Sequence, residues 1–179
     1  VVGSADDAMD PANAGFEKVA PDGAVVGWAL LPSATTDGAS MEASSEFAHT
    51  GVGSLGLAVR GHGSAAVEST PVTLEVGKLY RLSGWIRTEG AVSDATSKYP
   101  TAVPAVLTMA SFPFTNHSSA VGGDSDWSRV DSLFFATRRT DRVRLHLGYN
   151  GTARGTAWFD SALDHFEELR DPVRAEAAQ

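Results

Sequence analysis

The sequence predicts an all-β domain in which two antiparallel sheets pack face to face as a sandwich. Apolar residues alternate with polar residues at a period of two in several segments, which is the pattern of strands with one buried face. Clusters of Gly, Asp, Ser and Thr separate these segments and favour tight turns. No segment has a helical period, so roughly eight or nine short strands joined by turns are expected.

The alternating segments follow one another along most of the chain. They are residues 54–59, 79–88, 104–110, 128–136 and 142–149. Two stretches rich in Pro and Ser, 91–104 and 112–126, are predicted to be long loops on either side of one strand at 105–111. Loops of that length are more often functional than idle.

A chain of 179 residues normally forms one domain with a core large enough to fold without disulfides. We expect an N-terminal extension at 1–10, the sandwich at 11–169 and a polar, linker-like tail at 170–179. The start at Val1 and this tail suggest a module taken from a longer protein.

Composition and motifs argue against several classes of function. The net charge of −8 without a Lys/Arg stripe argues against nucleic-acid binding, and no apolar run is long enough for a membrane helix. The absence of cysteine excludes thiolate metal sites and cysteine nucleophiles. Because the G-x-S-x-G and H-E-x-x-H signatures are also missing, we expect a domain that is not an enzyme.

An ordered series of short motifs resembles bacterial carbohydrate-binding modules. The series is Asn13-Ala-Gly-Phe-Glu17, Gly27-Trp28, His49-Thr-Gly-x-x-Ser54-Leu, the strand 79–88, Asp126-Trp127 and Gly155-Thr-Ala-Trp-Phe-Asp160. It is similar to families four, nine and twenty-two, which accompany cellulases and xylanases. The resemblance spans about residues 13 to 169. It implies a galactose-binding-like jelly-roll sandwich, a poly- or oligosaccharide ligand, and a bacterial protein that is secreted or periplasmic.

The same resemblance implies a structural calcium ion. In these families the ion joins the glutamate of the opening motif to an aspartate of the last strand, which makes Glu17 and Asp160 the expected side-chain ligands. Carboxylate and carbonyl oxygens are the ligands that calcium requires. However, Ser161 stands where a second aspartate is usual, and the segment 162–166 shifts the expected alternation. The metal and the register of the last strand are therefore both open.

A candidate ligand surface follows from alternation in two strands. In the segment 79–88, Tyr80 begins the core-facing set, and Trp85 and Arg87 lie on the opposite face. In the segment 142–149, Arg144 and His146 lie opposite the core. If these strands share a sheet, as the resemblance implies, the four residues form one surface on which an indole stacks against a sugar ring. The alternative is that a long loop covers Trp85.

Three functions remain open from the sequence. The first is a non-catalytic carbohydrate-binding module appended to a secreted bacterial enzyme. The second is a structural domain that docks on an adjacent catalytic domain, with Met109 and the segment 112–114 as its contact patch. The third is a jelly-roll enzyme such as a lyase or an esterase, which the missing signatures disfavour.

Overall fold

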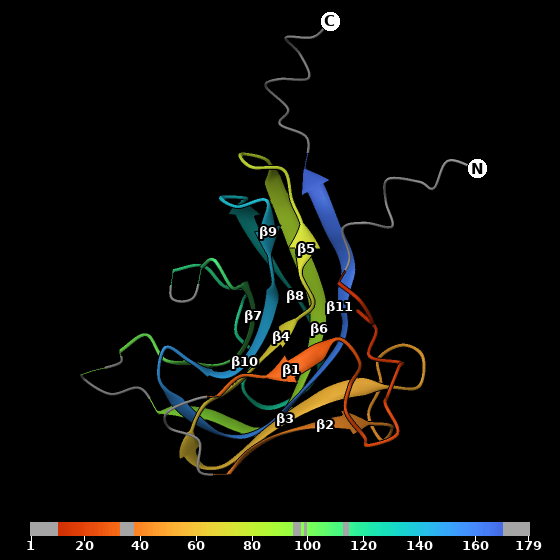
Figure 1. Ribbon diagram of the computed structural model, residues 1–179. Helices are drawn as coiled ribbons and strands as arrows, with labels where there is room; N and C mark the ends of the chain where they lie inside the picture. Colours follow the sequence, from red (N-terminus) through yellow and green to blue (C-terminus); the bar gives the residue numbers. More distant parts are fainter. Residues whose placement is uncertain (1–10, 33–37, 95–97, 99, 113–114, 170–179) are drawn as a thin grey trace, which may run out of the picture.

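A computed structural model describes residues 11–32, 38–94, 98, 100–112 and 115–169 of the chain, with side chains described as far as Asp160. The expected extension at 1–10 and tail at 170–179 lie outside these residues. All regular elements in the described part of the chain are β-strands. None of the described segments forms an apolar helix that could cross a membrane. The two main sheets curve around a common core, which confirms the predicted all-β sandwich (Figure 1).

The large sheet has five strands in the order β2-β3-β11-β6-β8, and the small sheet has four in the order β1-β4-β10-β7. A further pair, β5 and β9, stands apart from both sheets. Every pairing between these strands is antiparallel. The strands are β1 (Trp28–Leu30), β2 (Ala39–Ser44), β3 (Ser54–Gly63), β4 (Ala65–Ser69), β5 (Val72–Thr73), β6 (Leu79–Asp94), β7 (Val103–Met109), β8 (Gly123–Phe135), β9 (Thr140–Asp141), β10 (Val143–Tyr149) and β11 (Thr152–Leu169).

The long strands of the large sheet extend further than the sequence indicates. β6 has 16 residues and β11 has 18, and both run along much of the molecule in Figure 1. Residues 91–94 and 123–126 were expected in loops but belong to β6 and β8. The physical reason is pairing with a neighbour: residues 152–154 of β11 lie opposite residues 92–94 of β6, so sheet hydrogen bonds hold a polar segment extended.

The core lies between the two sheets and follows the predicted alternation. Leu57, Ile86 and Phe159 project inward from the large sheet, and Leu107 and Leu145 project inward from the small sheet, all fully buried. Each such side chain contributes about 2 kcal/mol of transfer free energy. Because these inward positions are fixed, the alternate residues of the same strands face outward.

The last strand contains an irregularity at the segment where the sequence departs from the expected alternation. Asp160 lies opposite Trp85, but the next paired residue of β11 is His165, opposite Ser83. Five steps along β11 therefore match two steps along β6, which is a bulge in β11. The bulge explains why residues 162–166 do not continue the alternating pattern.

Candidate functional site

The outer face of the large sheet carries a group of aromatic side chains. Trp85 of β6, Trp127 of β8 and Trp158 of β11 occupy outward positions of their strands. The loop between β2 and β3 adds Phe47 and His49, whose rings contact these tryptophans. We call these five side chains the aromatic face.

Trp158 lies over the neighbouring strand β3 because that strand has a glycine there. Gly56 is the register partner of Trp158, and a Cβ added to Gly56 would lie 3.3 Å from the indole Nε1. Phe47 packs edge-on against Trp158, with ring centroids 4.8 Å apart. As a result Trp158 is only 7% exposed, and Phe47 forms the accessible part of this end of the aromatic face.

Arg87 connects the aromatic face to a charged border. Its guanidinium carbon lies 4.4 Å from the centroid of the Phe47 ring, in cation–π geometry. The guanidinium also donates to Asp126 at 2.9 Å and to Glu89 at 3.2 Å. These two acceptors hold the planar guanidinium beside the aromatic rings, where it can donate to a ligand.

A bulge in β8 brings Asp126 and Trp127 to this border. Ile86 lies opposite Ser128 and Thr88 lies opposite Ser125, so Asp126 and Trp127 together oppose the single residue Arg87. The pKa of Asp126 is lowered from its ordinary value, chiefly because its carboxylate accepts the backbone N–H of Trp127 and also because it bonds to Arg87. Asp126 is therefore a charged acceptor at neutral pH.

His49 lies between two of the tryptophans. Its ring stacks on Trp85 with centroids 3.8 Å apart and planes inclined by 18°, and it meets Trp127 edge-on at 5.9 Å. Trp85 and Trp127 are both half-buried. Within the described residues, Trp85 Nε1, His49 Nδ1 and Arg87 Nε are buried without a hydrogen-bond partner. Buried polar atoms of this kind are uncommon and are often completed by water or a ligand.

Two carboxylates hold the loop that carries His49. The fully buried Asp160 accepts the backbone N–H groups of His49 at 2.5 Å and Thr50 at 2.8 Å through Oδ2. Glu17 accepts the N–H of Val52 at 3.1 Å and, more weakly, that of Gly53 at 3.4 Å. The opening segment and the last strand therefore fix the same loop from two sides.

The expected calcium ligands thus lie at one loop. However, their carboxylates contact backbone N–H donors, whereas the other ligands of a calcium ion are oxygen atoms. Both Glu17 and Asp160 accept hydrogen bonds from backbone N–H groups. A calcium ion requires oxygen atoms around it, and no group of three His, Asp or Glu side chains gathers within the part of the chain that the structure describes. Calcium binding by Glu17 and Asp160 therefore stays a prediction.

Arg144 and His146 do not lie beside Trp85 and Arg87. The expectation that the two strands share a sheet is wrong, because β6 belongs to the large sheet and β10 belongs to the small sheet. The alternation within each strand was predicted correctly, but alternation does not specify which sheet a strand joins. Arg144 and His146 are therefore on the opposite outer face of the sandwich.

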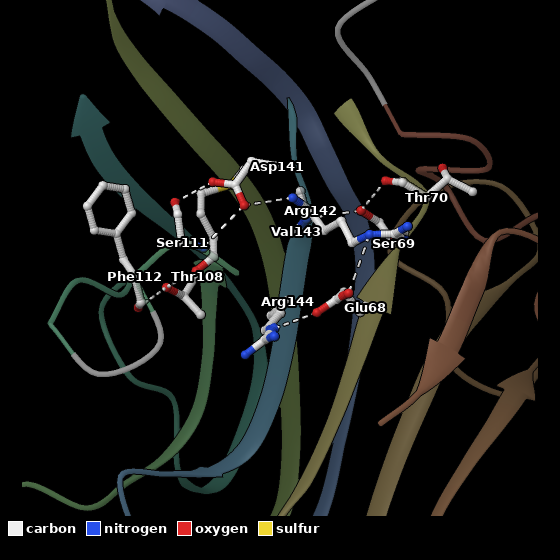
Figure 2. A network of polar contacts seen from close by, with 11 residues as sticks. Glu68, Ser69, Thr70, Thr108, Ser111, Phe112, Asp141, Arg142, Val143 and Arg144 are labelled. Carbon is white, nitrogen blue, oxygen red and sulfur yellow. Dashed lines mark hydrogen bonds and ion pairs between the residues drawn. The ribbon is translucent and has the colours of Figure 1, made fainter. Parts of the chain in front are cut away.

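Arg144 takes part in a polar network on the small sheet (Figure 2). Its Nε donates to Glu68 at 2.7 Å, and Arg142 approaches the same carboxylate at 3.5 Å and donates to the carbonyl of Ser69 at 2.7 Å. Glu68 and Arg144 are register partners in β4 and β10. The pairing gives the guanidinium of Arg144 and the carboxylate of Glu68 partners within the sheet, so Arg144 links β10 to β4.

His146 is packed against aromatic rings on the same face. Tyr149 meets it edge-on at 5.0 Å, and His117 lies 4.8 Å from Tyr149. Burial lowers the pKa of His146 to about 3, with smaller contributions from Arg144 and His117. His146 is therefore neutral at physiological pH, and its buried Nε2 has no partner among the described residues.

The predicted docking patch is not an exposed surface where it can be described. Met109 is 2% exposed and belongs to the core, and the half-buried Phe112 packs against the core with its ring 6.0 Å from Phe134. The expectation was wrong because β7 turns Met109 inward. Residues 113 and 114, the rest of the expected patch, lie outside the described residues.

One histidine–carboxylate pair bears on the enzyme alternative. His62 Nδ1 and Asp94 Oδ2 are 2.7 Å apart, and this contact is the main reason that the pKa of Asp94 is lowered. The hydroxyl of Thr152 lies 3.3 Å from the same carboxylate oxygen. A catalytic triad needs the hydroxyl at the other nitrogen of the histidine, so this cluster does not have triad geometry.

The sequence did not identify four of the five aromatic residues as ligand-site candidates. Two of them carry a usable signal, because Trp158 alternates with the buried Ala157 and Phe159, and Trp127 immediately precedes a predicted strand. Phe47 and His49 lie in a loop, where no period indicates direction. The placement of both involves residues more than a hundred positions away, because His49 donates to Asp160 and the Phe47 ring packs on Trp158.

Comparisons with known proteins find similarity at the level of structure. No family model matches the chain. No curated protein matches its sequence. One similar structure is the enzymatically active domain of tailspike protein 4 of bacteriophage CBA120, with a TM-score of 0.58 and 10% identity over 86% of this chain. The match spans only 21% of the tailspike chain.

Two similar structures are carbohydrate-binding modules matched over most of their length. The family 61 module TmCBM61, solved in complex with β-1,4-galactotriose, has a TM-score of 0.54 and 15% identity over 84% of this chain and 92% of the module. The xylan-binding CBM22-1 domain of Paenibacillus barcinonensis Xyn10C has a TM-score of 0.51 and 13% identity over 82% and 86%. At such low identity the likeness concerns the fold. The chain therefore has the β-sandwich fold of carbohydrate-binding modules, as its motif series predicts.

Proposed function

We propose that the protein is a non-catalytic glycan-binding module whose ligand lies on the aromatic face of the large sheet. The observation that carries this proposal is the gathering of Trp85, Trp127, Phe47 and His49 on one outer face, bordered by Arg87 and Asp126. Aromatic rings provide flat apolar surfaces against which sugar rings pack. Charged side chains held at fixed positions beside them can hydrogen-bond to sugar hydroxyls.

The fold supports the same proposal. Similar structures over most of the chain are carbohydrate-binding modules, and one of them was solved with a bound β-1,4-linked oligosaccharide. The border of the aromatic face offers both donors and acceptors, since Arg87 carries a guanidinium and Asp126 and Glu89 carry carboxylates. A neutral glycan, whose hydroxyls donate and accept, fits this mixture better than a polyanion does.

The test is a binding assay with the purified chain and soluble β-1,4-glycans, including β-1,4-galactotriose, xylan and cello-oligosaccharides. We expect dissociation constants between micromolar and millimolar, and a loss of about tenfold or more, roughly 1.4 kcal/mol, in Trp127→Ala. Isothermal titration calorimetry would measure both. Unchanged affinity in Trp127→Ala, with binding present, would show that the ligand lies elsewhere on the protein.

A matched control exists on the same strand. Phe135 of β8 is 61% exposed and lies eight residues after Trp127 on the same face, which is about 26 Å along the strand. Phe135→Ala removes an exposed aromatic ring from the same sheet without touching the aromatic face. We expect this variant to bind glycans as the wild type does.

Docking on a neighbouring catalytic domain is the second candidate function. The patch first expected for it is partly core, but Leu133 and Phe135 are 47% and 61% exposed at the end of β8. Exposed apolar side chains that lie together are a feature of contact surfaces. Attachment to an enzyme, and a secreted or periplasmic location, remain predictions that the full-length gene product and cell fractionation would test.

A further inference from the structure

We propose that the imidazole of His49 occupies the subsite in which a sugar ring binds, so that His49 is a built-in competitor that sets the affinity and selectivity of the module. This inference rests on the proposed function of the aromatic face. His49 is stacked on Trp85 with centroids 3.8 Å apart and near-parallel planes. That separation is the contact distance of two flat groups, and a sugar packed on the same indole would need the same space.

A second tryptophan, Trp127, bounds the space that the His49 ring occupies beside Trp85, and we call this space the slot. Trp127 meets the His49 ring edge-on at 5.9 Å, so the imidazole has Trp85 on one side and Trp127 on another. The two tryptophans come from different strands, β6 and β8. The bulge at Asp126 and Trp127 sets the position of Trp127 relative to Trp85. The side chain of His49 therefore fills a space bounded by the face of Trp85 and by the ring of Trp127.

The imidazole leaves buried polar atoms of the aromatic face and its border without hydrogen-bond partners. Trp85 Nε1, His49 Nδ1 and Arg87 Nε are all buried without a partner among the described residues. Two of the three are donors that would remain after His49 left, and a sugar hydroxyl or ring oxygen could accept from them. A ligand that satisfies buried donors gains over a group that leaves them unpaired.

The His49 side chain can leave the slot while the backbone of its loop stays in place. Asp160 accepts the N–H groups of His49 and Thr50, and Glu17 accepts that of Val52, so the backbone is held at His49 itself and at the residues that follow it. Rotation about the side-chain torsions of His49 is then enough to vacate the slot. Such rotamer changes are common when ligands bind, even where the backbone stays fixed.

When a competitor occupies the site, the apparent dissociation constant is the intrinsic one divided by the fraction of molecules in which the slot is open. His49→Ala should therefore bind β-1,4-galactotriose, or the best glycan of the panel, about tenfold more tightly than the wild type. His49→Phe keeps a flat ring in the slot and should bind no more tightly than the wild type. The double variant His49→Ala with Trp85→Ala should lose the gain, because the wall of the slot is gone.

Acrylamide quenching of tryptophan fluorescence gives a readout that needs no glycan. Removing the His49 ring should increase quenching in His49→Ala, and His49→Phe should resemble the wild type. If quenching increases but no variant binds any glycan, His49 covers Trp85 as described and the proposed glycan function is overturned. If the wild type and His49→Ala bind glycans equally, or if His49→Ala binds more weakly, the competitor role is overturned while glycan binding stands. An unchanged quenching constant in a folded His49→Ala would also overturn it.

Discussion

Lowering the pH from 7 to 5 should destabilise the protein through His146. Burial lowers the pKa of this histidine from 6.5 to about 3 in the folded state, and the nearby Arg144 and His117 add to the shift. The unfolded chain therefore binds a proton between these two pKa values that the folded protein does not bind. Stability contributed by the neutral form is complete above pH 6.5 and is lost as the pH falls toward 3.

The size of the effect follows from the shift. Each pH unit below the unfolded pKa lowers the free energy of unfolding by about 1.4 kcal/mol per group. The free energy of unfolding lost at pH 5 is therefore up to about 2 kcal/mol. The carboxyls of Asp94 and Asp126 have pKa values lowered from 3.8, and their contribution is lost only as the pH falls below that value. The window from pH 6.5 to 5 therefore separates His146 from these carboxylates.

Urea denaturation at pH 7, 6 and 5 would measure the effect in the wild type and in His146→Leu. Leucine has a comparable volume and carries no polar atom, so it removes both the titration and the unpaired Nε2. We expect the free energy of unfolding of the wild type to fall by up to about 2 kcal/mol between pH 7 and pH 5, with most of the loss below pH 6, and a clearly flatter profile in the variant. Equal pH dependence in the two proteins would refute the assignment to His146.

Two further predictions concern metal binding and backbone geometry. If Glu17 and Asp160 bind calcium, EDTA should lower the melting temperature and Glu17→Ala should remove that sensitivity, whereas an unchanged melt would leave both carboxylates as acceptors of loop N–H groups. Gly155→Ala should destabilise the protein by about 2 kcal/mol or more, because residue 155 has φ +106° and an added Cβ would collide with the Gly90 carbonyl. Gly77→Ala, at φ +84° with open space around it, should cost only about 1 kcal/mol, and equal losses at the two sites in a chemical melt would contradict the clash.

The sequence was sufficient to predict the fold class and the inward positions of most core strands. Alternation identified Leu57, Ile86 and Leu145 as core residues, and all three are fully buried. A period of two is a local property, since successive side chains of any strand point to opposite faces. The order of short motifs also predicted the resemblance to carbohydrate-binding modules, which the similar structures confirm at the level of fold.

Only the tertiary structure decided which outward positions form one surface. The sequence placed Trp85 and Arg144 opposite the core but could not assign β6 and β10 to different sheets, because partner choice depends on contacts between distant residues. His49 stacks on Trp85 from a loop whose backbone is bound by Asp160, far along the chain. Asp126 and Trp127 reach Arg87 because of a bulge, which the pattern of alternation does not show. Local periodicity therefore determined the core, and long-range pairing determined the candidate site.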